Sequence, residues 1–160
     1  MTPRLLRLAA YGVCIIDDRM LLARYVSPDA TQRHWTLPGG KVEHAEDPYD
    51  AVVREVGEET GYVVEVERLL GVDSRTWHVA WAGPSGGELH SVGVFYGIAI
   101  KGGELRNETG GSTDLAAWIP TSDIGRLERT VIIDIALDMH RSQPATGHVD
   151  PVEVGGLLRF

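Results

Sequence analysis

The segment from Gly39 to Gly61 constrains the fold most, because it contains a helix whose two ends can be located from local chemistry. Asp47 is a favourable N-cap residue, and Pro48 suits the first helical position, where no backbone donor is needed. Gly61 provides the left-handed conformation with which many helices end. The sequence therefore predicts a helix over residues 48–60, preceded by a break at the glycine pair 39–40.

Three carboxylates of this helix, Glu55, Glu58 and Glu59, are spaced i, i+3 and i+4 and therefore share one face. Like charges at this spacing destabilise a helix by roughly 0.2–0.5 kcal/mol per pair. A bound divalent cation would remove that repulsion, and oxygen ligands are those that Mg²⁺ or Mn²⁺ prefers. For such a run taken alone, a solvated acidic face is the alternative.

The loop before the helix adds groups of the same chemistry. A carbonyl at Gly40 could supply a further oxygen ligand, because glycine lets a ligand approach the backbone closely. Glu43 and Glu46 bring more carboxylates to the loop. Arg54 lies on another side of the helix, from which it can reach back, and we expect it to pair with Glu46. These neighbours favour a metal site over a merely solvated face.

The spacing of these residues resembles the Nudix box, G-x5-E-x7-R-E-U-x-E-E-x-G-U, in which U is a bulky aliphatic residue. The chain has Gly40, then Glu46, then the run Arg54-Glu55-Val56-Gly57-Glu58-Glu59-Thr60-Gly61-Tyr62. Every fixed position matches, and the single departure is Tyr62 in the last bulky position. Trp35-Thr36-Leu37-Pro38-Gly39 also resembles the usual lead-in to the box. The sequence is therefore similar to Nudix hydrolases over residues 40–62.

This resemblance implies a Mg²⁺-dependent hydrolase, with Mn²⁺ as a second candidate ion. Water would attack one phosphorus of a nucleoside diphosphate linked to another moiety, as in a nucleoside triphosphate or a nucleotide sugar. By the family pattern, Glu58 and Glu59 bind the metal directly, Glu55 binds it or orients its water, and the Gly40 carbonyl contributes. Arg54 would hold the loop through an ion pair. The remaining fixed positions would be structural: Gly39, Glu46 and Gly61.

The general base is not identified by the box. Many Nudix relatives place a glutamate shortly before the tryptophan of a late strand, which corresponds to Asp114-Leu115-Ala116-Ala117-Trp118. Leu115 occupies a position where a glutamate is common, and Asp114 is the nearest carboxylate, although a role as a strand-start or turn residue competes with the catalytic one. Glu108 or Glu104 from the preceding loop, or Glu59 from the box, are the alternatives.

Two other functions fit the same resemblance less well. A non-catalytic nucleotide sensor of the Nudix type usually lacks one or more box carboxylates, and this chain retains them all. An isomerase acting on a prenyl diphosphate would need a catalytic cysteine, whereas the single cysteine, Cys14, lies in an apolar run. The hydrolase is therefore the leading hypothesis and the sensor is its alternative.

The order of elements in the rest of the chain predicts an α/β fold, an α/β/α sandwich with a mixed sheet between helices, formed by one domain over residues 1–160. This order also resembles the Nudix fold. Residues 8–16 and 20–26 suggest a β-hairpin, and residues 62–72, 91–100 and 116–119 suggest further strands. Ser122 or Asp123 should cap a second helix, in which Leu127, Val131, Ile135 and Met139 recur at i+4 spacing. Residues 143–160 form a C-terminal tail in which a short strand could occur near 152–158.

The net charge of −8 argues against binding to nucleic acid or to an anionic membrane. Asp17 and Asp18 interrupt the early apolar stretch, so we expect a strand and a turn there and a cytoplasmic enzyme. A small nucleotide is the expected partner, and a homodimer remains an open alternative. Five aromatic residues could stack on a base: Tyr25, Trp35, Trp77, Trp81 and Phe95. Trp77 and His78 stand where Nudix subgroups carry a marker proline or tyrosine, so no substrate is assigned.

Overall fold

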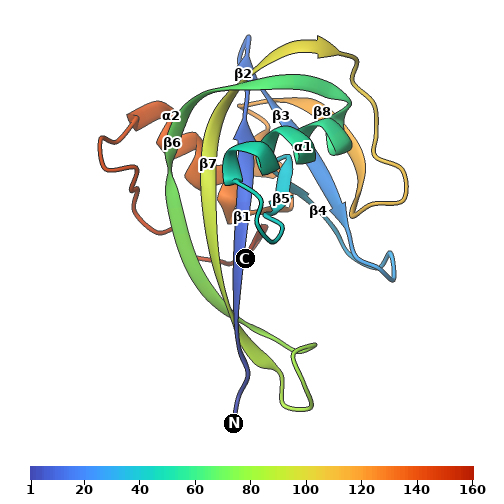
Figure 1. Ribbon diagram of the computed structural model, residues 1–160, viewed down its shortest axis with the longest axis vertical. Coiled ribbons are helices and arrows are strands. Elements are labelled where there is room, and N and C mark those ends of the chain that lie inside the picture. Colours follow the sequence, from blue (N-terminus) through green and yellow to red (C-terminus); the bar gives the residue numbers. More distant parts are fainter.

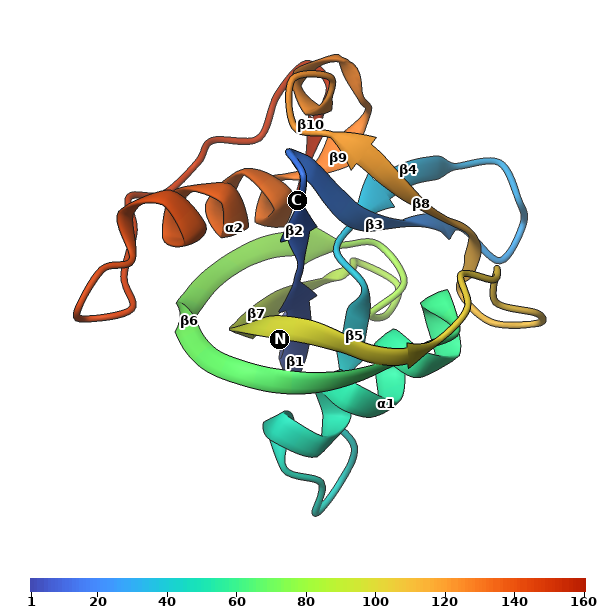
Figure 2. The same cartoon turned by 90° about the horizontal axis from the view of Figure 1, so that it is seen from above.

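The computed structural model describes residues 1–160, and its two helices lie on opposite sides of the strands (Figures 1 and 2). Helix α1 spans Pro48–Thr60 and helix α2 spans Val131–Ser142. The strands are β1 (Arg4–Val13), β2 (Ile15–Ile16), β3 (Arg19–Val26), β4 (Arg33–Thr36), β5 (Gly39–Lys41), β6 (Tyr62–Val79), β7 (Gly87–Gly103), β8 (Thr113–Pro120), β9 (Arg129–Thr130) and β10 (Leu158–Arg159). This mixed α/β architecture confirms the predicted fold class.

The strands form two sheets that combine parallel and antiparallel pairs. One sheet has the order β5-β1-β7-β6, in which β1 runs parallel to β7. The other has the order β10-β9-β4-β3-β2, with β8 paired to the second edge of β3. Side chains of β1 alternate between two hydrophobic cores: Ala9 and Tyr11 face the core of α2, whereas Ala10 faces the core of α1. Such alternation is expected of a central strand covered on both faces.

The predicted hairpin of residues 8–16 and 20–26 is wrong in its first strand. Only Ile15–Ile16 pairs with β3, around a turn at Asp17 and Asp18, whose φ angles are 50° and 57°. Positive φ at both central residues is typical of a type I′ hairpin turn. Residues 4–13 instead pair with β7 and β5, because a strand that is apolar on both faces gains most from a central position in a sheet.

Strands β6 and β7 form one long hairpin, paired from Tyr62 opposite Gly103 to Val79 opposite Gly87. It extends well beyond the predicted strands 62–72 and 91–100 and projects away from the helices (Figure 1). The added part of β6 carries Asp73 and Arg75 on its inner face. Because these inner residues are polar, the apolar alternation that predicts a strand does not appear in this part of the sequence.

Helix α2 begins later than predicted, with Thr130 rather than Ser122 or Asp123 as its N-cap. A 3-10 turn over Ile124–Arg126 and strand β9 come first. Leu127 has an extended backbone (φ −88°, ψ 140°), so its i+4 spacing to Val131 lies outside the helix. In the tail, β10 pairs with β9 at residues 158–159, slightly beyond the expected short strand. Neither helix is long and apolar enough to cross a membrane.

Candidate active site

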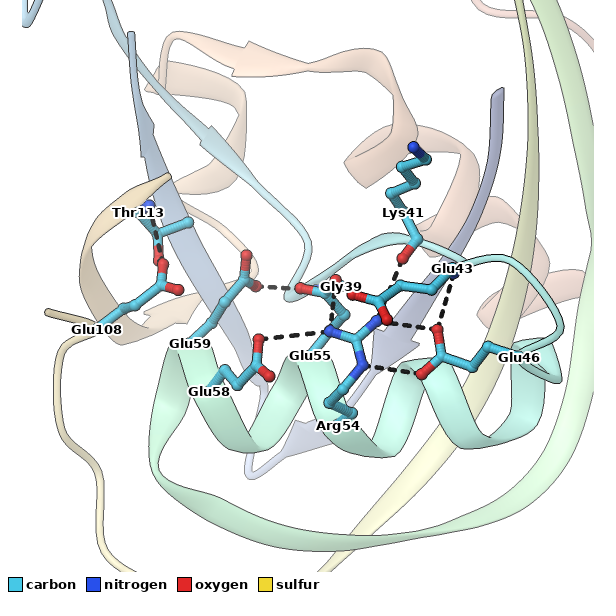
Figure 3. A network of polar contacts seen from close by, with 10 residues as sticks. All are labelled: Gly39, Lys41, Glu43, Glu46, Arg54, Glu55, Glu58, Glu59, Glu108 and Thr113. Carbon is cyan, nitrogen blue, oxygen red and sulfur yellow. Dashed lines mark hydrogen bonds and ion pairs between the residues drawn. The ribbon is translucent and has the colours of Figure 1, made fainter. Parts of the chain in front are cut away.

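Helix α1 has the predicted limits, and its caps are those expected from the sequence. The Asp47 carboxylate accepts a hydrogen bond from the backbone N–H of Tyr49 at 2.8 Å, Pro48 opens the helix, and Gly61 closes it with φ 79°. Val52 and Val56 are fully buried on the face toward the sheet. The C-terminal half of the helix consequently directs its glutamates toward the loop of residues 39–46 (Figure 3).

Arg54 is the hub of the polar network at this helix (Figure 3). Its Nε and Nη2 atoms donate to the two carboxylate oxygens of Glu46 at 2.8 and 3.0 Å, so the expected pair is present and bidentate. Nη1 also reaches Glu55 Oε1 at 3.0 Å and Glu58 Oε2 at 3.4 Å. Hydrogen bonds from Arg54 lower the pKa of Glu46 to about 2. The arginine thus holds the loop against the helix and contacts two of the acidic residues.

Glu59 is the most deeply buried of the three helical carboxylates, with 4% of the residue exposed. Its Oε2 atom accepts a hydrogen bond from the backbone N–H of Gly39 at 2.9 Å. Burial raises the pKa of Glu59 to about 9, against the lowering effect of that hydrogen bond and with the help of nearby Glu55. A cation bound beside Glu59 would compensate the negative charge that burial disfavours.

Gly40 lies directly against Glu55. A Cβ atom at Gly40 would come within 2.9 Å of the carboxylate carbon and both oxygens of Glu55, so no larger residue fits without moving that side chain. Burial raises the pKa of Glu55, while the hydrogen bond from Arg54 opposes the shift. The structure therefore brings together the glycine and the glutamate that the sequence assigned to one metal site.

The donor groups fit a divalent cation in chemistry. No three acidic, histidine or cysteine side chains converge on one point in this arrangement. Glu55 and Glu58 are turned toward Arg54, and Glu59 is turned toward Gly39. Even so, carboxylate oxygens are the ligands that Mg²⁺ prefers, and the raised pKa values of Glu55 and Glu59 reflect negative charge that a cation would compensate.

Glu108 faces the same carboxylates from the loop before β8 (Figure 3). Its Oε2 atom accepts hydrogen bonds from the backbone N–H and the hydroxyl of Thr113, at 3.0 and 2.6 Å. Its charge contributes to the raised pKa of Glu55 and of Glu59, which places it near both. Glu104, the other loop candidate, has its backbone carbonyl packed against Gly61.

Asp114 is held in ion pairs on the sheet. Its carboxylate accepts hydrogen bonds from Arg24 at 2.8 and 3.0 Å and from Arg33 at 3.2 Å. These two guanidinium groups, Arg24 first, hold the pKa of Asp114 below its usual range. The geometry gives Asp114 a clear structural task in joining β8 to β3 and β4.

Tyr62, the single departure from the box pattern, has a defined role in packing. Its hydroxyl accepts a hydrogen bond from the indole N–H of Trp118 at 3.0 Å, and the two rings lie 6.2 Å apart. Tyrosine therefore fills the bulky position and also satisfies a polar group of β8.

A cleft of about 840 Å³ opens beside the acidic cluster and extends along β6 to an aromatic end. Trp77 stacks on Phe160 with ring centroids 5.2 Å apart, and Tyr25 stacks on His34 at 4.8 Å. Of the predicted aromatic residues, Tyr25, Trp77, Trp81 and Phe95 line the cleft, whereas Trp35 packs against the core. The sequence did not single out Phe160, and His34, the stacking partner of Tyr25, is buried.

The sequence model of the NUDIX domain family matches residues 6–137. The chain belongs to the Nudix family. A solved structure of a Nudix hydrolase from Nitrosomonas europaea has the same fold, with a TM-score of 0.67 and 22% identity over 85% of this chain and 88% of that one. The predicted family membership is therefore confirmed.

Two curated Nudix relatives match parts of the chain. A MutT-like protein of Streptomyces ambofaciens is 43% identical over 75 residues, which are 47% of each chain. An ADP-ribose pyrophosphatase of Methanocaldococcus jannaschii is 35% identical over 98 residues, which are 61% of this chain and 53% of the relative. The Nudix chain thus spans only about half the length of these relatives.

Proposed function

We propose that this Nudix chain is a Mg²⁺-dependent hydrolase that cuts the diphosphate bond of a nucleoside diphosphate linked to another moiety. The observation that carries the proposal is the placement of the α1 carboxylates: Glu55 and Glu59 line one end of a cleft whose other end is aromatic, and Arg54 contacts Glu55 and Glu58. Residues 1–160 act as one domain, because the tail returns through β10 and places Phe160 in the cleft.

The residues of α1 and of the preceding loop have different proposed roles. Glu58, Glu59, Glu55 and the Gly40 carbonyl would hold the cation, and the backbone N–H of Gly39 fixes Glu59. When bound, the cation neutralises the diphosphate and lowers the pKa of a bound water. Arg54 positions the loop through Glu46 and also donates a hydrogen bond to Glu55.

Glu108 is proposed as the general base in preference to Asp114. Its free oxygen, Oε1, has no hydrogen-bond partner in the protein, while Oε2 is fixed by Thr113. A carboxylate anchored by one oxygen presents the other for proton transfer from water. Asp114 is already neutralised by two arginines, which makes it a poor proton acceptor.

The substrate class follows from the two ends of the cleft. An aromatic end suits a nucleobase, because base and aromatic rings stack face to face. The volume of about 840 Å³ is in the range of sites for small ligands. The name of one relative, an ADP-ribose pyrophosphatase, supports a nucleotide substrate.

A panel assay tests this proposal. Nucleoside triphosphates, ADP-ribose and nucleotide sugars are incubated with the chain and Mg²⁺, and phosphate or pyrophosphate release is measured, with phosphatase added where the product is a phosphomonoester. We expect release from at least one compound and a loss of at least about 100-fold in kcat for Glu59→Gln. Tight nucleotide binding without release from any compound would support the sensor instead, and unchanged turnover of the variant would contradict the mechanism.

A further inference from the structure

The inner face of the β6–β7–β1 sheet carries side chains in rows that cross the three strands. Arg7 of β1 lies opposite Ser91 of β7, and Ser91 lies opposite Arg75 of β6. The three residues all line the cleft. Two arginines therefore flank one small hydroxyl residue in a single row of the cleft floor.

The position of this row is fixed by its neighbours. Tyr11 lies four residues after Arg7 on β1, at the acidic end of the cleft. In the opposite direction, Trp77 of the aromatic stack lies two residues after Arg75 on β6, in the next row. Adjacent rows on one face of a strand are separated by two residues, or about 6.6 Å. The arginine row thus lies between the carboxylates of α1 and the aromatic rings.

The electrostatics of Tyr11 agree with this placement. Burial raises the pKa of the Tyr11 phenol, the positive charge of Arg7 lowers it, Glu59 raises it and Arg75 lowers it. Both guanidinium groups and one α1 carboxylate are thus close enough to act on the same hydroxyl. The positive charges of Arg7 and Arg75 therefore lie close to the α1 carboxylates.

The two arginines are unequally paired. Arg75 donates from Nε and Nη2 to a single oxygen of Asp73, at 3.0 and 2.8 Å, and both side chains are largely buried. Its Nη1 atom takes no part in that pair. Arg7 forms no ion pair with any carboxylate, although the chain carries a net charge of −8. A half-buried guanidinium without an anion, in an acidic protein, leaves donors free for a ligand.

The row between the arginines and Tyr11 is formed by Ala9, Gly93 and Asp73. Gly93 is its central residue, and a Cβ atom there would lie 3.1 Å from the rings of Phe95 and Tyr11. Ser91, only 7% exposed, adds a hydroxyl at the centre of the arginine row. Because Gly93 has no side chain, the two rings pack against the cleft floor, and the arginine row with Ser91 is the next row along the floor toward Trp77.

We propose that Arg7 and Arg75 form an anion-binding pair for a phosphate of the substrate, on the nucleoside side of the α1 carboxylates. This inference rests on the proposed function and assigns it two specificity-determining residues outside the Nudix box. Planar guanidinium groups match the oxygens of phosphate and bind them through charge-assisted hydrogen bonds. Substrates with a phosphate between the base and the cleaved bond would be selected over those without one.

The test measures binding of inorganic pyrophosphate by calorimetry in EDTA, so that no metal contributes. We expect Arg7→Gln to weaken binding by about 10- to 100-fold, the range for one charge-assisted hydrogen bond. Arg4→Gln is the matched control, because Arg4 lies on the same strand outside the cleft, and it should bind like the wild type. Equal affinity of Arg7→Gln and wild type, or no measurable binding by the wild type, would overturn the proposal.

The role of Arg75 is tested with a double variant, because removing Arg75 alone would leave Asp73 without its partner. Arg75→Gln combined with Asp73→Asn removes the pair as a unit and leaves no unpaired buried charge. With a substrate from the panel, we expect this variant and Arg7→Gln to raise KM with little change in kcat, as for loss of uniform binding. If the variants bind pyrophosphate more weakly than the wild type but no panel compound is hydrolysed, the anion site is supported and the proposed hydrolase function is contradicted.

Discussion

Glu59→Gln should make the metal-free protein more stable while it removes activity. Glu59 is 4% exposed, and burial raises its pKa from 4.5 to about 9. Glutamine has nearly the same shape and keeps an oxygen that can accept the hydrogen bond from Gly39. The variant therefore removes the ionisation of the group without leaving a cavity.

The size of the effect follows from linkage between protonation and folding. Below pH 4.5 both the folded and the unfolded chain carry a protonated Glu59, so the side chain causes no pH-dependent loss. Between pH 4.5 and about 9 only the unfolded chain ionises, and the free energy of unfolding falls by about 1.4 kcal/mol per pH unit. At pH 7 the interval is about 2.5 units, which gives a loss of about 3 kcal/mol that glutamine avoids.

Urea denaturation in EDTA at pH 4 and pH 7 measures this difference. We expect Glu59→Gln to exceed the wild type by about 3 kcal/mol at pH 7 and to equal it within about 0.5 kcal/mol near pH 4. Added Mg²⁺ should stabilise the wild type more than the variant, because only the wild type provides this ligand. A variant that is less stable than the wild type at pH 7, or a difference that does not change with pH, would refute the reasoning.

Three further outcomes are expected. Glu108→Gln should lower kcat by about 100-fold or more in steady-state assays, whereas Asp114→Asn should keep kcat within about tenfold and lower the urea midpoint instead; the reverse order would reject Glu108 as the base. Gly40→Ala should displace the Glu55 carboxylate, 2.9 Å from the new Cβ, and weaken Mg²⁺ binding in calorimetry with the fold retained by circular dichroism. Cys14, buried and with its pKa raised by burial to about 11, should resist a thiol reagent at pH 8 and react fully in denaturant; rapid native labelling would contradict its burial.

The parts of the fold that the sequence predicted are those fixed by local chemistry. Helix α1 begins at the expected cap, Asp47, and ends at Gly61, because both caps are short-range features. The Arg54–Glu46 pair was also predictable, since Glu46 lies just before α1 and Arg54 lies midway along that helix. The resemblance to the Nudix box added the proposed metal ligands, which no local rule assigns.

Long-range pairing was not predictable in the same way. Strand β1 pairs in parallel with β7 and not with β3, its expected hairpin partner. This pairing buries both faces of β1. The start of α2 was misplaced because Leu127 continues the helical spacing by coincidence, while β9 breaks the helix. Arg7 and Phe160 reach the cleft from opposite ends of the chain, and only the folded structure brings them to it.

The most direct test of the central claim is ³¹P NMR of the best panel substrate with wild type and Glu58→Gln, each in Mg²⁺ and in EDTA. For the wild type in Mg²⁺ we predict that the linked diphosphate resonances disappear and that resonances of the separated phosphate products replace them. EDTA should stop the conversion, and the variant should slow it by at least about 100-fold. Intact diphosphate resonances for every panel compound, or conversion that persists in EDTA or in the variant, would contradict the account.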